Sequence, residues 1–522
     1  MLSTSNIRPH QSALIHGVTI RILLGILLSG LGGLMFLLAF PPYGFWYLAW
    51  FGFVPALLAQ YRVMPSRLSS LASAVFSGVW LGPFLGRLFG PDFGPFFQYL
   101  GIWIAILNFF VSKDRRFHEL TNYRWFILQG VFAWVGLEMV RATFIPLVAT
   151  SAFIGYTQAP QPWLIQPVSI LSVYGLNLII ILCNYALAQG VMIWMDRKWT
   201  VDDFVSVDVR STKWWLLGMG ITLVVWISLS LVLLNSPADQ PKVRVAALRP
   251  NFTLPAFQDE VNTSRVRFDV ISEQAREATD QGARILYTPE MMFAFDPQQE
   301  FTEEFRALVK EIDAYLFITY VVSHEGQPWR NEAVLLTPQG EFLEVYGKNH
   351  AFWEPPSAVR GVFPVYNTPL GRLATLICHD ANYTDIARKL TANGAQIIAA
   401  PYREFAGFGE QAWTNVLFRA VENRTAMVMS GVASVSAIIN PDGSLVELDT
   451  NIAGSRVILI GDVTLGTGPT LYTLTGDIVG WAALAGWIIF MVFQSTTERR
   501  LKKMEAGSTA FPSLNEPIKE QK

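Results

Sequence analysis

Long apolar runs with few charges dominate the first 235 residues, and one more such run lies near the C-terminus. A helix needs about 20 mainly apolar residues to cross the roughly 30 Å hydrocarbon core of a bilayer. The first run is longer than a signal-peptide core and another run follows it closely, so we expect it to be retained. Runs of this kind predict about eight membrane spans, at 19–39, 46–61, 70–90, 95–112, 124–143, 168–195, 213–235 and 477–495.

Between the seventh and eighth runs the pattern changes to that of a soluble α/β protein. About ten strands, with few helices between some pairs, predict two sheets packed face to face and covered by helices. Eight of these strands are expected at Val243–Leu248, Ile285–Tyr287, Leu316–Val322, Ala333–Leu336, Leu373–Ile377, Ile397–Ala399, Ala426–Ser430 and Arg456–Asp462. The helices are expected at Val261–Thr279, Phe301–Ile312, Thr384–Ala392 and Trp413–Asn423.

These two patterns divide the chain into four parts. We expect a membrane domain of about seven helices at 1–238 and a catalytic domain at 239–470. A C-terminal membrane helix is expected at 471–498, followed by a polar tail at 499–522.

The basic residues of the short loops predict an orientation for the spans. Loops rich in Lys and Arg remain in the cytoplasm. Counted along the predicted spans, every basic cluster falls on one side, and the loops on the other side carry almost no positive charge. Both termini are therefore expected inside and the α/β domain outside. Representative members of the basic clusters are Arg21, Arg62, Arg116, Lys198 and Arg499.

Composition excludes several classes of function. The chain is 52% hydrophobic and only 15% charged, and its formal net charge of −2 argues against a nucleic-acid partner, because phosphate binding needs a basic surface. The spacings typical of zinc sites, P-loops and dinucleotide-binding folds are missing from the sequence, so we expect no metal and no cofactor. Cys183 and Cys378 lie in a membrane run and in the soluble segment respectively, which makes a disulfide between them unexpected.

Three predicted strands of the soluble segment end in a reactive side chain: Glu290, Lys348 and Cys378. A thiol with a pKa of about 8.5 is a weak nucleophile until a base or a cation lies beside it. A carboxylate near Cys378 would accept the thiol proton. An ammonium group, together with the backbone N–H of His379, would stabilise an oxyanion. The three residues therefore predict nucleophilic catalysis by Cys378, with Glu290 as base and Lys348 as oxyanion stabiliser.

Each of these residues also has a simpler interpretation. A lone Cys at a strand end is usually a small buried apolar residue. A Glu after Pro is most often a solvated loop carboxylate, and a Lys near a turn most often lies on the surface. His379 and Asp380 would suit a metal pair, but no further His or Cys ligands cluster with them. The case for catalysis therefore depends on the combination and on the residues that flank it.

Those flanking residues match a known pattern. Pro289-Glu290, Lys348-Asn349-His350 and Ile377-Cys378 resemble the three strand ends of the nitrilase superfamily, and Arg419, Ala420 and Glu422 resemble its Arg-Ala-x-Glu helix. The membrane part resembles one branch of that superfamily, the apolipoprotein N-acyltransferases, and the resemblance covers about residues 25–495. The matching membrane motifs are Leu38 to Trp46, Trp134 with Glu138 and Arg141, Gly155-Tyr156-x-Gln158, Val173 to Leu176, and Gly468 to Asp477.

The resemblance implies an αββα sandwich with a Glu–Lys–Cys triad, in which Glu354 would be a second, positioning glutamate. Three loops depart from the branch. Cys378-His379-Asp380 replaces a usual Cys-Tyr-Glu, the residues from Ala351 to Pro355 replace a Pro-Phe-Gly-Glu run, and 401–405 replace an Asn-Asp-x-Trp-Phe stretch. Because these loops shape the cleft, preference for acyl donor or acceptor is expected to differ.

The activity that the resemblance implies is acyl transfer in the bacterial cytoplasmic (inner) membrane. A phospholipid would donate the acyl group through a Cys378 thioester, and the N-terminal amine of a diacylglyceryl-modified prolipoprotein, after signal-peptide cleavage, would accept it. The catalytic domain is expected on the extracytoplasmic (periplasmic) face, in a monomer surrounded by membrane lipid. One alternative is a membrane-tethered amidase or hydrolase that uses the same triad with water. A lipid-binding scaffold with a vestigial domain is a non-enzymatic alternative.

Two further groups of residues invite a functional interpretation. Glu138 and Arg141 lie three positions apart on one helical face, which predicts an intramembrane ion pair that either serves function or locks helix packing. Aromatic residues in the loops around the triad would suit a substrate-binding, lipid-facing rim or a buried core. They are Phe352, Trp353, Phe405, Phe408 and Trp413.

Overall fold

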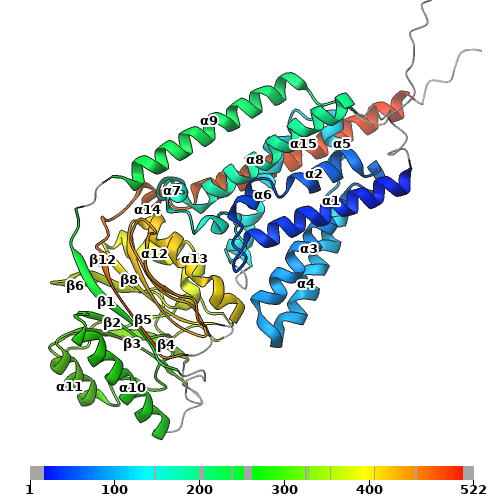
Figure 1. Ribbon diagram of the computed structural model, residues 1–522. Helices are drawn as coiled ribbons and strands as arrows, with labels where there is room; N and C mark the ends of the chain where they lie inside the picture. The colour runs from blue at the N-terminus through cyan, green and yellow to red at the C-terminus, as the bar shows by residue number, and fades with distance from the viewer. Residues whose placement is uncertain are drawn as a thin grey trace, which may run out of the picture.

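A helical bundle and an α/β sandwich make up the molecule, and the sandwich lies against one end of the bundle (Figure 1). The N-terminal end of α1 and the C-terminal end of α15 both lie at the opposite end of the bundle. This computed structural model describes residues 17–145, 149–198, 205–236, 239–251, 261–323, 326, 328–352, 354–404, 406–452 and 455–508.

In the described part of the chain, seven helices are long and apolar enough to cross a membrane. They agree with seven of the predicted spans, although the last helix continues beyond the predicted end at residue 498. The seven helices are α1 (Val18–Ala39), α3 (Ser70–Leu88), α4 (Gly90–Val111), α6 (Phe126–Phe144), α8 (Val168–Lys198), α9 (Val209–Leu234) and α15 (Ile478–Ser508).

The second predicted span is not one continuous helix. It consists of a 3-10 turn η1 (Trp46–Trp50), a short helix α2 (Val54–Leu58) and a π-helical turn η2 (Ala59–Val63). Broken helices persist at membrane depth only where the freed backbone groups find partners inside the protein. Here the Asn184 side chain accepts a hydrogen bond from the Phe53 N–H at 2.9 Å and donates one to the Ala49 carbonyl at 2.8 Å.

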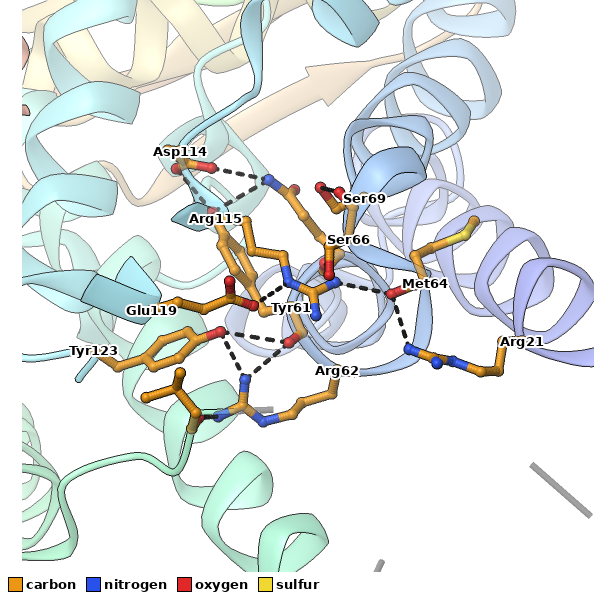
Figure 2. Close-up of polar contacts among 12 residues, drawn as sticks. Arg21, Tyr61, Arg62, Met64, Ser66, Ser69, Asp114, Arg115, Glu119 and Tyr123 are labelled. Atoms are coloured by element: carbon orange, nitrogen blue, oxygen red, sulfur yellow. Dashed lines mark hydrogen bonds and ion pairs between the residues drawn. The ribbon is translucent and has the colours of Figure 1, made fainter. Parts of the chain in front are cut away.

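Arginine side chains stabilise the far end of this broken span (Figure 2). Arg21 Nε donates to the Val63 carbonyl at 3.0 Å, and Arg115 Nη1 donates to the Met64 carbonyl at 2.8 Å. Arg62 donates to the Tyr61 carbonyl at 2.8 Å and pairs with Asp196 of α8 at 2.8 Å. The last carbonyls of a helix carry partial negative charge, which guanidinium groups complement. These contacts hold α1, α8 and the broken span together at the end of the bundle away from the sandwich.

Shorter helices complete the membrane-associated part. A residue with positive φ, Ser172 (φ 57°), kinks α8 near its N-terminal end. The remaining short elements are η3 (Ser66–Leu68), α5 (Arg115–Leu120), η4 (Ile154–Gln158), α7 (Pro162–Ile165) and α14 (Leu471–Thr475).

The sandwich contains two six-stranded sheets, which confirms the predicted pair of sheets and exceeds the number of about ten strands that the pattern predicts. One sheet has the order β12-β1-β2-β3-β4-β5, formed by β1 (Lys242–Arg249), β2 (Ile285–Tyr287), β3 (Tyr315–Val322), β4 (Arg330–Leu336), β5 (Tyr346–Gly347) and β12 (Val457–Thr464). The other has the order β11-β10-β9-β8-β7-β6, formed by β6 (Tyr366–Thr368), β7 (Gly371–Thr375), β8 (Ile397–Arg403), β9 (Ala426–Val432), β10 (Ser436–Ile439) and β11 (Leu445–Asp449).

Helices cover the outer face of each sheet, which confirms the αββα architecture. α10 (Val261–Asp280) and α11 (Thr302–Ile312) cover the first sheet, and α12 (Asp385–Ala392) and α13 (Ala406–Asn423) cover the second. Between the sheets, alternate residues of facing strands form a separate apolar core. Examples are Val245, Ile285, Leu373, Ile397 and Val428.

The helical layer α12–α13 also packs against the bundle, so that one apolar core runs through both. Polar contacts reinforce this junction. Glu422 of α13 pairs with Arg419 at 2.8 Å. Glu422 also accepts a hydrogen bond at 2.9 Å from the Val173 N–H, which lies next to the kink in α8. Thr150, beside η4, donates to the Asn382 carbonyl at 2.6 Å. Because Asn382 ends the turn that begins at Cys378, the bundle directly contacts the element that carries the proposed nucleophile.

Candidate active site

The predicted site residues follow three different strands, and the structure brings them to one place. Glu290 follows β2, Lys348 follows β5, and Cys378 follows β7 of the other sheet. Lys348 Nζ lies 2.9 Å from Glu290 Oε1, and the side chains of Lys348 and Glu290 are only 4% and 2% exposed. The charges of both residues act on the Cys378 thiol. The three residues that follow predicted strand ends therefore lie in one buried site.

Two more side chains hold the Glu290–Lys348 pair. Lys348 Nζ lies 2.5 Å from Glu354 Oε1, and Glu354 Oε2 accepts the Phe352 N–H at 3.3 Å. Glu354 thus lies where a second, positioning glutamate is expected. Asn331 donates from Nδ2 to Glu290 Oε1 at 2.8 Å. Sequence reasoning missed Asn331, which stands between Arg330 and Glu332 at the start of β4, where no local pattern distinguishes it from its polar neighbours.

Lys348 is held in its charged form. Burial lowers the pKa of its ammonium group, but the negative charges of Glu290 and Glu354 outweigh burial and raise the pKa well above the usual value for lysine. A charged donor fixed inside a buried site suits the stabilisation of an oxyanion, because it needs no rearrangement when charge develops.

Cys378 lies in a strained, buried position. It begins the turn η6 (Cys378–Asn382) with φ at 50°, a left-handed conformation that is uncommon for residues other than glycine. Such strain is often found at functional sites. Burial raises the pKa of the Cys378 thiol, the negative charges of Glu290 and Glu404 raise it further, and the positive charge of Lys348 opposes them. The thiol is therefore protonated at neutral pH and needs a base before it attacks.

A residue that sequence reasoning did not select, Glu404, contacts the thiol. Cys378 Sγ lies 3.2 Å from Glu404 Oε1 and 3.5 Å from the Arg403 carbonyl oxygen. Burial raises the pKa of Glu404 to about 7. Glu404 follows β8, the parallel neighbour of β7. Sequence reasoning did not select it because the predicted strand ended at Ala399, whereas β8 continues to Arg403. Glu404 lies in the 401–405 stretch, where the chain departs from the family pattern.

His379 and Asp380 shape the turn after the nucleophile. Asp380 accepts the Ile377 N–H at 3.0 Å, the Tyr346 hydroxyl at 2.6 Å and the His350 N–H at 2.7 Å. The His379 ring lies 2.8 Å from the Asn382 amide through Nδ1. These partners give both side chains a role in holding η6, and within the described residues no group of three or more His, Cys, Asp or Glu is placed to hold a metal.

The predicted aromatic rim is described only in part. Trp353 and Phe405 lie outside the described residues. Phe352 is half-buried, with its ring centroid 4.7 Å from that of His379 and 5.5 Å from that of Phe408. Phe408, which the sequence places among the candidate rim residues, is buried, and Trp413 packs partly buried against the core.

These aromatic side chains connect the site to the bundle. The Phe89 ring, at the junction of α3 and α4, lies 5.0 Å from that of Phe408 and 6.4 Å from that of Phe352. Arg87 of α3 pairs with Glu410 of α13 at 2.5 Å. An apolar connection therefore runs from the membrane helices to the loop beside His379.

Glu138 and Arg141 do not form the predicted ion pair: no nitrogen–oxygen contact within 4 Å joins them in the described part of the chain. Glu138 instead accepts hydrogen bonds from Trp134 Nε1 at 3.1 Å and from Asn177 Nδ2 at 2.7 Å. The Arg141 guanidinium lies over the Phe153 ring, 5.3 Å from its centroid. Because Asn177 belongs to α8, this network fastens α6 to α8 and favours the packing interpretation.

The two parts of the chain match two different protein families. Residues 257–469 match the carbon–nitrogen hydrolase family, and residues 32–186 match the apolipoprotein N-acyltransferase N-terminal domain. An apolipoprotein N-acyltransferase of Geobacter metallireducens is 25% identical over 511 residues, which cover 88% of this chain and 93% of the relative. A deaminated glutathione amidase of Synechocystis sp. is 26% identical over 193 residues, which cover 31% of this chain and 71% of the relative.

A solved structure is also similar to part of the chain. An amidase from Nesterenkonia sp. aligns with a TM-score of 0.37 at 21% sequence identity, covering 42% of this chain and 90% of the amidase. The Geobacter relative matches most of the length of this chain, whereas the Synechocystis amidase matches less than half of it.

Proposed function

We propose that this chain is an apolipoprotein N-acyltransferase, in which a phospholipid donates the acyl group and a lipoprotein N-terminus receives it; the matches to both family models and to the Geobacter relative support this proposal. The acceptor is the α-amine of a diacylglyceryl-modified cysteine, freed by cleavage of the signal peptide. Both substrates carry acyl chains in the bilayer, and the seven apolar helices make this a multi-pass membrane protein. A site beside the bundle receives both without extracting either into water.

In the first step, Cys378 Sγ attacks the carbonyl carbon of the phospholipid ester while Glu290 accepts the thiol proton. The Lys348 ammonium and the His379 N–H stabilise the resulting oxyanion. The ester C–O bond then breaks, and the proton passes to the leaving oxygen. A lysophospholipid departs and a thioester remains on Cys378.

In the second step, the acceptor amine attacks the thioester carbon and loses a proton to Glu290. The C–S bond breaks, the sulfur regains a proton, and an amide has formed. The single observation that carries this mechanism is the buried Lys348–Glu290 pair, at 2.9 Å, whose charges act on the Cys378 thiol. It supplies a base and an oxyanion partner for one sulfur atom.

We also propose that the sandwich lies on the extracytoplasmic face of a bacterial cytoplasmic membrane. The basic loops of the sequence support this orientation. The placement of α1 and α15 supports it too, because their outer ends lie together at the end of the bundle opposite the sandwich. Phe352 and Trp413, with Trp353 and Phe405, stay candidates for contact with substrate.

Acylation of Cys378 tests the proposal directly. Purified protein would be incubated with labelled phospholipid, and the peptide that contains Cys378 would be analysed by mass spectrometry. We expect an acyl adduct on the wild-type protein and none on Cys378→Ser. Cys183→Ser is a matched control, because Cys183 is a buried thiol of α8, and its adduct yield should equal that of the wild type.

The acceptor is tested by adding a diacylglyceryl-cysteine peptide to the acylated enzyme. Release of an N-acylated peptide supports the transferase. Release of free fatty acid alone would show that water is the acceptor, and the membrane-tethered hydrolase would then replace the transferase.

A further inference from the structure

The carboxylate that contacts the nucleophile is not the one that the mechanism above uses as base. We propose that Glu404 is a second proton acceptor for Cys378, so that two carboxylates serve the thiol. This inference deepens the proposed function and rests on Cys378 being its nucleophile. It follows from geometry that places Glu404 against the sulfur and engages Glu290 elsewhere.

The parallel pairing of β7 and β8 brings the two residues together. Leu373 pairs with Ile397 and Thr375 with Ala399, so the two strands run side by side and their C-terminal ends meet at one edge. Cys378 continues from β7 and Glu404 from β8. The result is the 3.2 Å contact in which the thiol donates to Glu404 Oε1.

Glu290, in contrast, is occupied by other donors. Its Oε1 accepts hydrogen bonds from Lys348 Nζ at 2.9 Å and from Asn331 Nδ2 at 2.8 Å. In the resting site the carboxylate in contact with the sulfur is therefore Glu404, whereas Glu290 is bound to the Lys348 ammonium.

The charges around Glu404 suit a group that gains and loses a proton near neutral pH. Burial raises the pKa of Glu404 to about 7, while the Cys378 hydrogen bond and the Lys348 charge lower it and the charges of Glu290 and Glu354 raise it. The buried Tyr402 hydroxyl also interacts with Glu404 and the thiol. A base whose pKa lies close to the working pH is the most effective one.

The proposed step is a simple transfer. The S–H bond of Cys378 breaks, its proton moves to Glu404 Oε1, and the sulfur electron pair forms the bond to the ester carbonyl carbon. When the C–O bond of the ester breaks, the proton moves from Glu404 to the leaving oxygen. Glu404 ends the step as a carboxylate, ready for the next turnover.

The negative charge of Glu404 alone would have the opposite effect. A nearby carboxylate disfavours the thiolate and raises the pKa of the thiol. Removing that charge would then make Cys378 more reactive. If Glu404 is a base, its removal should slow the reaction of Cys378 with an alkylating reagent; if it is only a nearby charge, its removal should speed that reaction. The proposal can therefore be tested without any lipid.

The test is the rate at which iodoacetamide alkylates Cys378 in the full-length protein, measured between pH 5.5 and 9. Mass analysis of the Cys378 peptide quantifies the alkylated fraction. In the wild type we expect the rate to rise with an inflection near pH 7. Glu404→Gln should slow alkylation about 100-fold at neutral pH, the lower end of the contribution of a general base, and should remove the inflection. Glu404→Asp keeps a carboxylate and should retain part of the alkylation rate and part of the inflection.

The controls separate this site from other groups. Burial also raises the pKa of Glu422 to about 7, so an inflection near pH 7 in the wild type does not by itself identify Glu404. Loss of the inflection in Glu404→Gln does identify it. Glu447→Gln changes an exposed carboxylate of β11 and should leave the rate unchanged. If Glu404→Gln does not fold, Glu404→Asp decides: a slowed rate with a displaced inflection supports the proposal, and a wild-type profile overturns it.

Alkylation of Glu404→Gln at the wild-type rate or faster would overturn the proposal. That outcome would leave the acyl-transfer mechanism with Glu290 as its base intact. Conversely, failure of the lipid or peptide assays would remove the proposed substrates without changing the alkylation result.

Discussion

Lys348 lies between two carboxylates, and its charge organises the site. Its ammonium group contacts Glu290 at 2.9 Å and Glu354 at 2.5 Å while almost completely buried. Removing one partner of a buried ion pair leaves an uncompensated charge and costs about 3–5 kcal/mol. The arrangement therefore needs all three groups, and its electrostatics should be visible in the stability of the protein as well as in catalysis.

The Glu354–Lys348 contact predicts a pH dependence of stability. Burial raises the pKa of Glu354, but the charge and hydrogen bond of Lys348 outweigh burial and hold the pKa below its usual value. A carboxyl with a lowered folded-state pKa stabilises the protein above its unfolded pKa of about 4.3 and loses this contribution as the pH falls through the folded value. Thermal unfolding of Glu354→Gln should show the largest loss at pH 7.

That loss should shrink as the pH falls below about 4, where the carboxyl of the unfolded chain takes up a proton while that of the folded protein is still charged. Glu300→Gln, an exposed carboxylate of the same domain, serves as the control and should differ little from wild type at any pH. A stability difference for Glu354→Gln that stays constant from pH 7 to pH 3 would contradict the assigned ion pair.

At the scale of elements, helix α13 connects catalysis to the membrane. It covers the second sheet, follows Glu404, and contacts both α3 and the kink of α8. Its first turn approaches the end of α3 so closely that a Cβ on Gly407 would lie 1.9 Å from the Arg87 carbonyl oxygen. Glycine at this position therefore permits the contact between the bundle and the loop that carries Glu404.

Gly407→Ala should consequently destabilise the protein. The added methyl group has backbone atoms on its path, so α3 and α13 must move apart, and overpacking of this kind typically costs about 1–3 kcal/mol. Thermal unfolding in detergent would measure the effect. Gly218→Ala, in α9, has no atom within 4 Å of the new Cβ and should leave the melting temperature unchanged or higher. Equal melting temperatures for both variants would contradict the close packing.

At the scale of the whole molecule, the bundle has two chemically different ends. The sandwich lies at one end, and buried arginines with their carboxylate partners lie at the other (Figures 1 and 2). Positively charged loops favour the cytoplasmic side. We therefore expect the sandwich to be accessible from outside the cytoplasmic membrane and the arginine-rich end of the bundle to be accessible from the cytoplasm.

Cysteine labelling would measure this accessibility. Glu447→Cys, exposed on β11 of the sandwich, should react with a membrane-impermeant maleimide in intact spheroplasts. Arg116→Cys, exposed on α5 at the other end of the bundle, should react only after permeabilisation. The native thiols, both buried, provide the background. The reverse pattern would place the sandwich in the cytoplasm and remove the proposed access to lipoprotein substrates.

Local patterns were sufficient for much of the architecture. The apolar runs of α1, α8 and α15 exceed the length needed to cross a bilayer, and the short strands of the sandwich alternate with amphipathic helices. Such signals depend only on residues close together in sequence. The second span was harder, because its run is apolar although the backbone breaks near Gly52 and Pro55. Side chains from other elements satisfy its backbone groups, among them Asn184 of α8 and Gln158 of η4.

The sequence by itself determined the fold class and seven of the eight predicted spans, and it selected the strand-end residues Glu290, Lys348 and Cys378, because periodicity and strand ends are local properties. Only the tertiary structure decided that Asn331 contacts Glu290, that Glu138 binds Asn177, and that Glu404 meets the thiol. Each of these contacts joins residues on different elements. Sheet register and helix packing set which side chains meet, and no local pattern encodes that choice.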